Sequence, residues 1–233
     1  MKGGGLYITG TDTGVGKTAV AAAVVRRLVA DGTPVGVYKP VASGVPPGGL
    51  AAGSDAAVLW EAAGRPGPLA AVCPQAFAAP IAPPRAARAE GRRVDERLLV
   101  TGLSACHGAA VVVVEGAGGL FSPLADGLTN ADLAIAAGLP LVVVDAARLG
   151  AIGRTVAVVR AAAAAGLRVA AVVLSHVDPL AGSLDDPASA ASIARDSAVD
   201  LATLLAPIPV AVLRHGRPAI EPDLDWRRLA GGG

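Results

Sequence analysis

Residues 9–18 read Thr9-Gly10-Thr11-Asp12-Thr13-Gly14-Val15-Gly16-Lys17-Thr18, which is the composition of a phosphate-binding loop. The apolar run at 6–9 is short enough to be a buried β-strand. Residues 18–28 are rich in helix-forming side chains and contain neither Gly nor Pro. A glycine-rich segment that ends in Gly-Lys-Thr between a strand and a helix is the setting that a P-loop requires. The sequence therefore predicts a P-loop that binds a nucleoside triphosphate.

The residues of this loop suit phosphate and metal binding. Glycines allow tight turns and a close approach of the backbone to a polyanion. Lys17 is expected to reach the β- and γ-phosphates, and the Thr18 hydroxyl to bind Mg²⁺. Backbone N–H groups at the start of the following helix would face the phosphates. We expect the nucleotide contacts at Gly14, Val15, Gly16, Lys17, Thr18 and Ala19.

The spacing of the loop differs from the common motif. Gly10 and Gly16 are separated by one residue more than in the standard pattern, and Thr11 stands where that pattern has Gly. A glycine-rich turn without function is the alternative interpretation. We disfavour it because the strand, the glycines, Gly-Lys-Thr and the helix occur together in the required order.

Length and composition indicate one α/β domain spanning 1–233, with a flexible tail at about 229–233. A net charge of +1 gives no strong field that would select nucleic acid. The longest apolar stretch, 133–144, is interrupted by Gly138 and Pro140, so it falls short of the roughly 20 residues of a membrane helix. We therefore expect neither a nucleic acid nor a membrane as partner.

The N-terminus and the cysteines agree with a cytoplasmic protein. The first residues lead directly into the first predicted strand, so we expect no signal peptide. Cys73 and Cys106 are isolated in sequence and need no disulfide. A reducing cytoplasm fits this usage best.

Strand-like and helix-like segments alternate along the chain. Val-rich runs at 34–38, 109–114, 141–144, 169–174 and 209–213 are typical of strands, and segments 55–63, 94–107, 156–165 and 188–205 of helices. Residues 43–53 and the Pro-rich stretch 64–84 are predicted as loops. Continuous apolar strands between helices predict a mainly parallel sheet with helices on both faces, a three-layer α/β fold.

Ligands of such sheets bind outside the carboxyl ends of the strands, where polar residues of this chain gather. Glu115 follows four valines, and a carboxylate there is costly unless it is paired or bound to a metal. Satisfaction by local backbone N–H groups is the alternative. Lys39 is either a second positive charge near the phosphates or a solvated side chain, and Asp145 a switch or a cap. His176 follows the end of a predicted strand, so we expect a loop histidine near the nucleotide.

Other charged residues have simpler interpretations. Asp55 at the start of a helix favours an exposed acid that stabilises the helix dipole. The arginines of 85–97 are interleaved with acids, which indicates a solvated face. His107, His176 and His215 show no metal-ligand spacing.

Taken together, several segments resemble the dethiobiotin synthetase family. They are TGTDTGVGKT (9–18), YKPVASG (38–44), Ser54-Asp55, VEGAGG (114–119) and Leu149-Gly150, in family order over almost the whole chain. The resemblance implies a seven-stranded parallel sheet, a homodimer, and ATP-dependent closure of the ureido ring of 7,8-diaminononanoate with CO₂. A carbamate and a carbamic–phosphoric anhydride would be the intermediates.

The resemblance also implies roles for particular residues. Lys39 would be catalytic together with Lys17, because transfer between two anions needs positive charge. Thr18, Asp55 and Glu115 would hold Mg²⁺, and Ser43 would contact the substrate. The backbone of Gly116, Ala117 and Gly118 would lie beside phosphates and substrate. The substrate carboxylate would bind across the dimer interface at the start of a helix, at Gly150, Ala151 and Ile152.

The chain departs from the family where the adenine base is read. Ser175 replaces the expected Asn, and Asn130 is the only Asn of the chain. A serine cannot make the paired donor and acceptor contact that an amide makes with adenine. We therefore expect weak base selectivity, with Ser175, His176 and the backbone of Pro209, Val210 and Ala211 supplying what remains. Gly14 and Gly153 also replace polar residues found in some members.

Two related classes are the alternatives. Cobyrinate amidoligase-like ligases usually carry a glutaminase domain with a nucleophilic cysteine, for which the chain after Arg214 leaves no room. Partition-type switch ATPases place an additional Lys early in the phosphate loop, and residues 11–14 contain none.

Overall fold

A computed structural model describes residues 4–46 and 49–231, which form an α/β fold around one large sheet. Its seven strands run in the order β11-β10-β9-β8-β1-β5-β2. Among the described strands of this sheet, only the edge strand β11 pairs antiparallel. The strands are β1 (Gly4–Gly10), β2 (Val35–Tyr38), β5 (Val111–Gly119), β8 (Leu141–Ala146), β9 (Val169–Ser175), β10 (Val210–Leu213) and β11 (Ile220–Glu221). The predicted mainly parallel seven-stranded sheet is confirmed.

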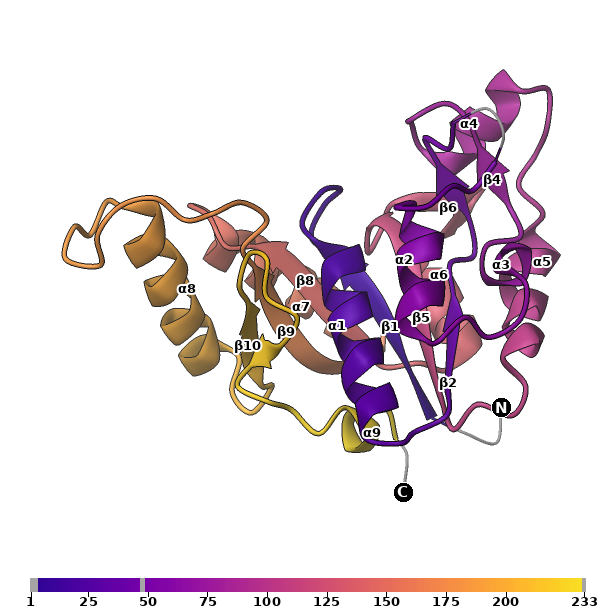
Figure 1. Ribbon diagram of the computed structural model, residues 1–233. Helices are drawn as coiled ribbons and strands as arrows, with labels where there is room; N and C mark the ends of the chain where they lie inside the picture. Colours follow the sequence, from indigo (N-terminus) through magenta and orange to yellow (C-terminus); the bar gives the residue numbers. More distant parts are fainter. Residues whose placement is uncertain (1–3, 47–48, 232–233) are drawn as a thin grey trace.

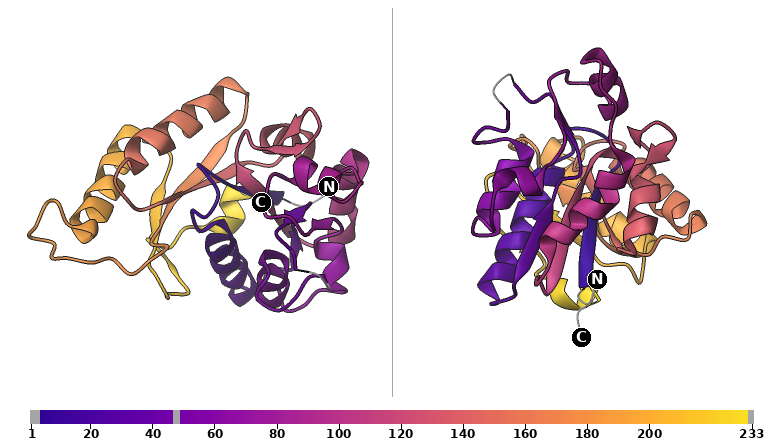
Figure 2. Two further views of the ribbon diagram at one scale, coloured as in Figure 1. Left: turned by 90° about the horizontal axis from the view of Figure 1, so that it is seen from above. Right: turned by 90° about the vertical axis from the view of Figure 1, so that its right-hand side faces the viewer.

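Helices cover both faces of the sheet, as Figure 1 and the view from above in Figure 2 show. One layer contains α1 (Lys17–Ala30), α2 (Asp55–Ala62) and α9 (Trp226–Leu229), and the other α6 (Asn130–Ala137), α7 (Ala151–Ala164) and α8 (Ala190–Leu204). Successive strand side chains point to opposite faces. Leu6 and Ile8 accordingly pack in the α1 core, whereas Tyr7 packs in the other.

Several local predictions need correction. The helix expected at 94–107 is α5 (Glu96–Thr101) followed by a 3₁₀ helix, Gly102–Cys106. The 3₁₀ helix begins at Gly102, which packs against the Tyr38 ring so closely that only glycine fits there. The stretch expected to be irregular at 64–84 contains α3 (Leu69–Val72), β4 (Ala76–Phe77) and the start of α4 (Pro83–Ala89). β4 pairs with β3 (Ala42–Ser43), whose second residue is the first of the expected 43–53 loop.

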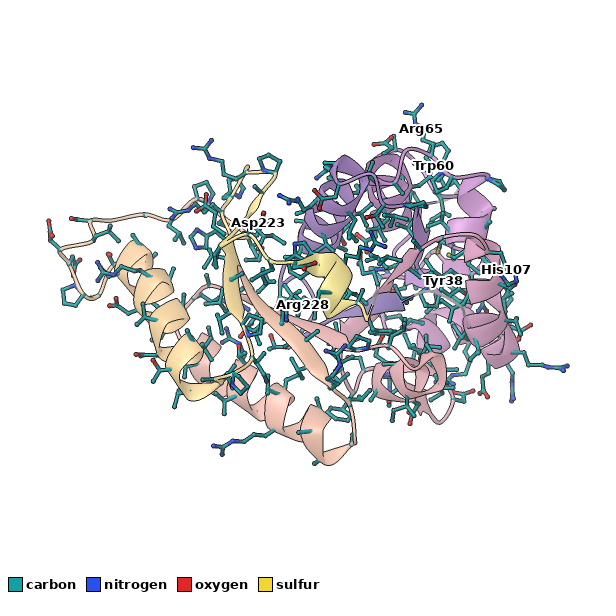
Figure 3. All side chains as sticks on the ribbon, turned by 90° about the horizontal axis from the view of Figure 1, so that it is seen from below. Tyr38, Trp60, Arg65, His107, Asp223 and Arg228 are labelled. Atoms are coloured by element: carbon teal, nitrogen blue, oxygen red, sulfur yellow. The ribbon has the colours of Figure 1, made fainter. Side chains whose placement is uncertain are left out.

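The end of the chain is more ordered than predicted. Leu229 belongs to α9, and the buried Ala230 accepts a hydrogen bond from the Gly5 N–H at 2.9 Å. Figure 3 shows α9 from below, with Arg228 labelled, under the edge of the sheet where the strands begin. These two residues are therefore part of the fold and not of a tail, since Leu229 ends α9 and the Ala230 carbonyl bonds to the first strand. Gly232 and Gly233, like Met1–Gly3, lie outside the described residues.

Two further elements have no clear local signal in the sequence, namely the hairpin of β6 (Pro123–Ala125) with β7 (Leu128–Thr129) and the α6 helix. Thr129 caps α6 and forms a capping box with Asp132. Among the helices of the described part of the chain, none is long and apolar enough to cross a membrane.

Candidate active site

The phosphate-binding loop lies between β1 and α1, at the edge of the sheet where the parallel strands end (Figure 1). Gly16 precedes α1 with a φ of 91° and caps the helix without a side chain, so the first N–H groups stay available to an anion. A Cβ on Gly16 would lie 2.3 Å from Ser175 Oγ, which leaves room for glycine only. Lys17 Nζ folds back over the loop and donates to the Asp12 carbonyl at 2.8 Å.

Lys39 forms the centre of a charged cluster beside this loop. Its Nζ donates to Glu115 Oε1 at 2.6 Å and to Asp55 Oδ2 at 2.9 Å. Thr18 Oγ1 donates to the same Glu115 oxygen at 2.9 Å. The structure thus brings together the residue directly after β2, one from β5, one from α1 and one from α2. Asp55 is the half-exposed first-turn acid that its position favoured, and in addition it belongs to the cluster through Lys39.

The charges of this cluster shift one another's pKa values. Burial alone would lower the pKa of Lys39, but the carboxylates of Glu115 and Asp55 raise it above the usual value. Burial would raise the pKa of Asp55, but Lys39 lowers it below the usual range. Burial and the nearby Lys39 ammonium lower the pKa of Lys17. Lys39 therefore stays charged, while Lys17 holds its proton less firmly than an ordinary lysine.

The oxygen atoms of the cluster fit a magnesium ion that arrives with a nucleotide. Glu115 Oε2 is buried, and no hydrogen-bond partner for it is found in the described residues. Hydroxyl and carboxylate oxygens of Thr18, Asp55 and Glu115 are the donors that Mg²⁺ prefers, usually one or two carboxylates completed by phosphates and water. Within 4–46 and 49–231 no group of three or more His, Cys, Asp or Glu side chains is arranged for a metal. The phosphates would have to complete this site.

A cavity of about 550 Å³ joins the loop to the cluster. Ser43 on β3 lines it, and its contact with the substrate stays a prediction. Its walls also include Ser122 and residues 80–83 and 123, which sequence reasoning missed because short loops give no periodic signal. Predicted residues that line it are Gly14, Gly16, Lys17, Thr18, Lys39, Ser43, Asp55, Glu115, Ala117 and Gly118. Val15 is buried in the core and Ala19 is exposed on α1, and nucleotide contact by their backbone stays a prediction.

A second cavity of about 350 Å³ lies next to it and shares Gly14. Ser175 and His176 at the end of β9 line it, as the expected base-binding position requires. Burial and then the Arg214 charge lower the pKa of His176.

The structure does not bring Pro209, Val210 and Ala211 to this position. Val210 pairs with Val172 near the start of β9, and the Pro209 carbonyl is used by the Val172 N–H at 2.9 Å. These residues begin β10, whereas ligands meet the ends of strands. The backbone next to His176 is that of Leu213, whose carbonyl accepts from the His176 N–H at 2.8 Å. Arg214 and His215 follow it, and the strand-end rule applied to 209–213 would have found them.

Asp145 is fully buried and connects the P-loop to α7. It accepts from Thr11 Oγ1 at 2.6 Å and from Thr155 Oγ1 at 3.2 Å, and it pairs with Arg154 at 3.2 Å. Gly150, with a φ of 86°, starts α7 without a side-chain cap. Gly150, Ala151 and Ile152 line neither described cavity, and the adjacent Leu149 is 80% exposed.

The parallel sheet, the P-loop at its carboxyl edge and the neighbouring lysine–carboxylate cluster define a P-loop nucleotide-binding α/β protein. Comparisons agree: a family described as "AAA domain" matches residues 4–212. A relative from Anaeromyxobacter dehalogenans, named ATP-dependent dethiobiotin synthetase BioD, is 49% identical over 197 residues, or 82% of this chain and 84% of the relative. Another of that name, from Anaeromyxobacter sp. strain K, is 45% identical over 230 residues, or 96% and 93%. The chain belongs to the dethiobiotin synthetase BioD family.

A solved structure supports the fold. The signal recognition particle receptor FtsY from Elizabethkingia anophelis, in complex with GDP, superposes with a TM-score of 0.54 at 16% identity. The superposition covers 100% of this chain and 64% of the receptor. At this identity the likeness is one of fold alone.

Proposed function

We propose that this protein is an ATP-dependent dethiobiotin synthetase of biotin biosynthesis. It would convert 7,8-diaminononanoate, CO₂ and ATP to dethiobiotin, ADP and phosphate. One observation supports this most: Lys39, held at 2.6 Å by Glu115, shares a cavity with Lys17 and Thr18 of the P-loop. A lysine at that place adds a positive charge to the side of the phosphates that the P-loop lysine does not cover.

The reaction brings two anions together, and the positively charged side chains of the site would offset their repulsion. One amine of the diamine adds to CO₂, loses a proton and becomes a carbamate. A carbamate oxygen then forms a bond to the γ-phosphorus while ADP leaves. The second amine attacks the carbonyl carbon of the resulting anhydride, phosphate departs and the ring closes. Lys17 and Lys39 would offset the negative charge that builds up on the transferred group.

Magnesium, bound by Thr18, Asp55 and Glu115 together with the phosphates, would neutralise charge on the β- and γ-phosphate oxygens. The backbone of Gly116, Ala117 and Gly118 would lie along the phosphates and the substrate. Ser43 would donate to the substrate from the opposite wall. Gly116 already offers its carbonyl to Lys39 Nζ at 3.4 Å.

The substrate carboxylate is proposed to bind at the start of α7, at Gly150, Ala151 and Ile152 of a partner subunit. The N–H groups of a helix start attract an anion, and that of Ala151 would have to give up its present acceptor, the Arg148 carbonyl at 3.0 Å. The exposed Leu149 beside them would then be covered in a homodimer. We propose a cytoplasmic homodimer with these small molecules as its only substrates.

Phosphate release in the presence of ATP, Mg²⁺ and bicarbonate, with and without 7,8-diaminononanoate, tests the proposal. We expect release only with the diamine, in a one-to-one ratio with dethiobiotin measured by mass spectrometry. Release that is independent of the diamine would contradict the proposal and favour a switch ATPase.

A further inference from the structure

Strand β5 leaves its register with β1 directly after Glu115. Ile8 pairs with Glu115, and the next pair is Gly10 with Gly119. Thr9 alone therefore spans Gly116, Ala117 and Gly118, which bulge out of the sheet. Ala117 and Gly118 line the cavity, so this bulge is part of its wall. Bulges of this kind re-aim side chains and are common beside active sites.

Asn130, the first residue of α6, fills the bulge and is fully buried. Its Nδ2 donates to the carbonyls of Ala117 at 2.8 Å, Gly119 at 2.8 Å and Ser122 at 3.2 Å. Its Oδ1 accepts from the Ala117 N–H at 3.1 Å. One amide thus ties the middle of the bulge to the residues that close it. Backbone groups that β1 would have paired in a regular ladder are satisfied by this side chain instead.

Tyr7 of β1 fixes the orientation of that amide. Its hydroxyl donates to Asn130 Oδ1 at 2.8 Å. Burial and then the nearby Glu115 charge raise the pKa of Tyr7, so the phenol keeps its proton. A flipped amide would direct its N–H groups at the Ala117 N–H, which can only donate, and its oxygen at the carbonyls of Ala117 and Gly119. The pair also explains the glycine at 116, where a Cβ would lie 2.3 Å from Asn130 Oδ1 and 3.0 Å from Tyr7.

We propose that Asn130, oriented by Tyr7, is a positioning residue that holds the 116–119 bulge in the shape that binds a magnesium nucleotide. Asn130 lines neither described cavity and acts through the backbone that it fixes. Glu115 directly precedes the bulge, so a shift of the bulge would move the backbone next to its carboxylate. The role of Asn130 in nucleotide binding does not rest on the proposed function. Only its effect on the synthetase reaction does.

Two tyrosines of the chain provide a matched test. Tyr38 is buried like Tyr7 and also donates one hydrogen bond, to the Leu98 carbonyl of α5 at 2.7 Å. Tyr38 pairs with Val114 of β5 from one side and Tyr7 pairs with it from the other, but the Tyr38 hydroxyl bonds to α5 and not to the bulge. Tyr38 is labelled in Figure 3. Tyr7→Phe and Tyr38→Phe each remove one buried hydroxyl, so both should lower the melting temperature. Only Tyr7→Phe should weaken binding of Mg²⁺-ADP, by about fivefold or more.

The affinity is measured by calorimetry at several Mg²⁺ concentrations. We expect the half-saturating Mg²⁺ concentration to rise for Tyr7→Phe and to stay within about twofold of the original for Tyr38→Phe. Asn130→Asp keeps the size and the acceptor, but an ionised carboxylate donates to none of the three carbonyls, so this variant should weaken binding further. Equal affinities of the two tyrosine variants would overturn the proposal.

The outcome for the proposed function is separate. If the unchanged protein binds Mg²⁺-ADP but releases no phosphate with the diamine, the synthetase activity fails while the comparison of the two tyrosines still decides the role of Asn130. If Asn130→Asp does not fold, Tyr7→Phe alone decides it.

Discussion

Lys39 Nζ and Glu115 Oε1 lie 2.6 Å apart, with only 4% and 1% of their side chains exposed. Two such charges are removed from water at a high cost, which their mutual attraction offsets only while both are present. The same Glu115 oxygen accepts from Thr18 of the P-loop. The ion pair therefore connects the end of β2 to β5 and to the nucleotide loop. Substitutions in this pair should change both the free energy of unfolding and the activity, which can be measured separately.

Removing one partner of this pair should destabilise the fold. Glu115→Gln leaves the Lys39 ammonium buried with only the half-exposed Asp55 as counter-charge. We expect the free energy of unfolding in urea to fall by about 3 kcal/mol. Adding Lys39→Met to the Glu115→Gln variant should lower the free energy of unfolding by less than Lys39→Met does in the unchanged protein, because the ion pair is already lost. Arg27→Met breaks an exposed ion pair with Asp223 and should change stability far less; a similar loss in both would contradict this account.

Lys39→Met should affect turnover more than nucleotide affinity. The lysine is placed to stabilise charge on the transferred group, and loss of one such donor costs roughly 10²–10³ in kcat. KM for ATP should change only a few-fold, because the P-loop and Lys17 remain. Steady-state kinetics with the diamine measure both constants. A variant with full kcat would remove the catalytic role of Lys39.

The nucleotide loop and the strand-end charges could be predicted because both depend on local sequence. Glycines beside Lys17 specify a turn, and four valines before Glu115 specify a buried strand with an acid at its end. The role of Asp55 was misjudged from position alone, since its contact with Lys39 depends on how α2 packs across a loop. The resemblance, not the spacing, placed it at the site.

The base-binding backbone and the role of Asn130 could not be found in the same way. The strand at 209–213 was predicted correctly. The base contacts were assigned to its first residues, whereas the residues after its end lie beside His176. Asn130 bonds to Tyr7, which is 123 residues away in sequence. Asparagine is otherwise typical of turns and caps, so no local pattern indicates a buried amide that supports a distant loop.

The lowered pKa of Lys17 should limit nucleotide binding at alkaline pH. Below this pKa the ammonium attracts the phosphates, and as the pH rises through it the charge and the affinity are lost. Because the pKa lies under the ordinary value of 10.5, the decline should begin at lower pH than for a free lysine. The pKa of Lys39 is raised, so that lysine stays charged over the same range.

ADP affinity measured against pH checks this. Lys17→Arg should remove the decline, because a guanidinium keeps its proton. Lys39→Met should shift the decline to higher pH, because it removes the repelling ammonium and leaves two carboxylates. A decline at an unchanged pH in both variants would assign it to another group.

Base selectivity should be weak. Ser175 lines the second cavity, but its short side chain packs against Gly16 and cannot make the paired donor and acceptor contact with adenine that an amide makes. We expect turnover with ATP, CTP and GTP to agree within about tenfold, since one good amide–base contact is worth about 1–3 kcal/mol. Pro209→Ala changes the residue before β10 and Arg214→Met the residue after it. Only Arg214→Met should alter the ratios of turnover with the three nucleotides. A strong preference for ATP in the unchanged protein would contradict the expectation.

Asp145 should stabilise the junction between the P-loop and α7. Its carboxylate is fully buried and joins Thr11, Thr155 and Arg154. Asp145→Asn keeps the shape but replaces one acceptor oxygen by a donor that then faces a hydroxyl or the guanidinium. We expect a loss of about 2–3 kcal/mol in the free energy of unfolding, from an unsatisfied buried group and a weakened ion pair. Asp196→Asn, which breaks an exposed pair with Arg195, is the matched control and should leave stability nearly unchanged. Equal urea midpoints for the two variants would mean that the buried carboxylate contributes no more than a surface charge.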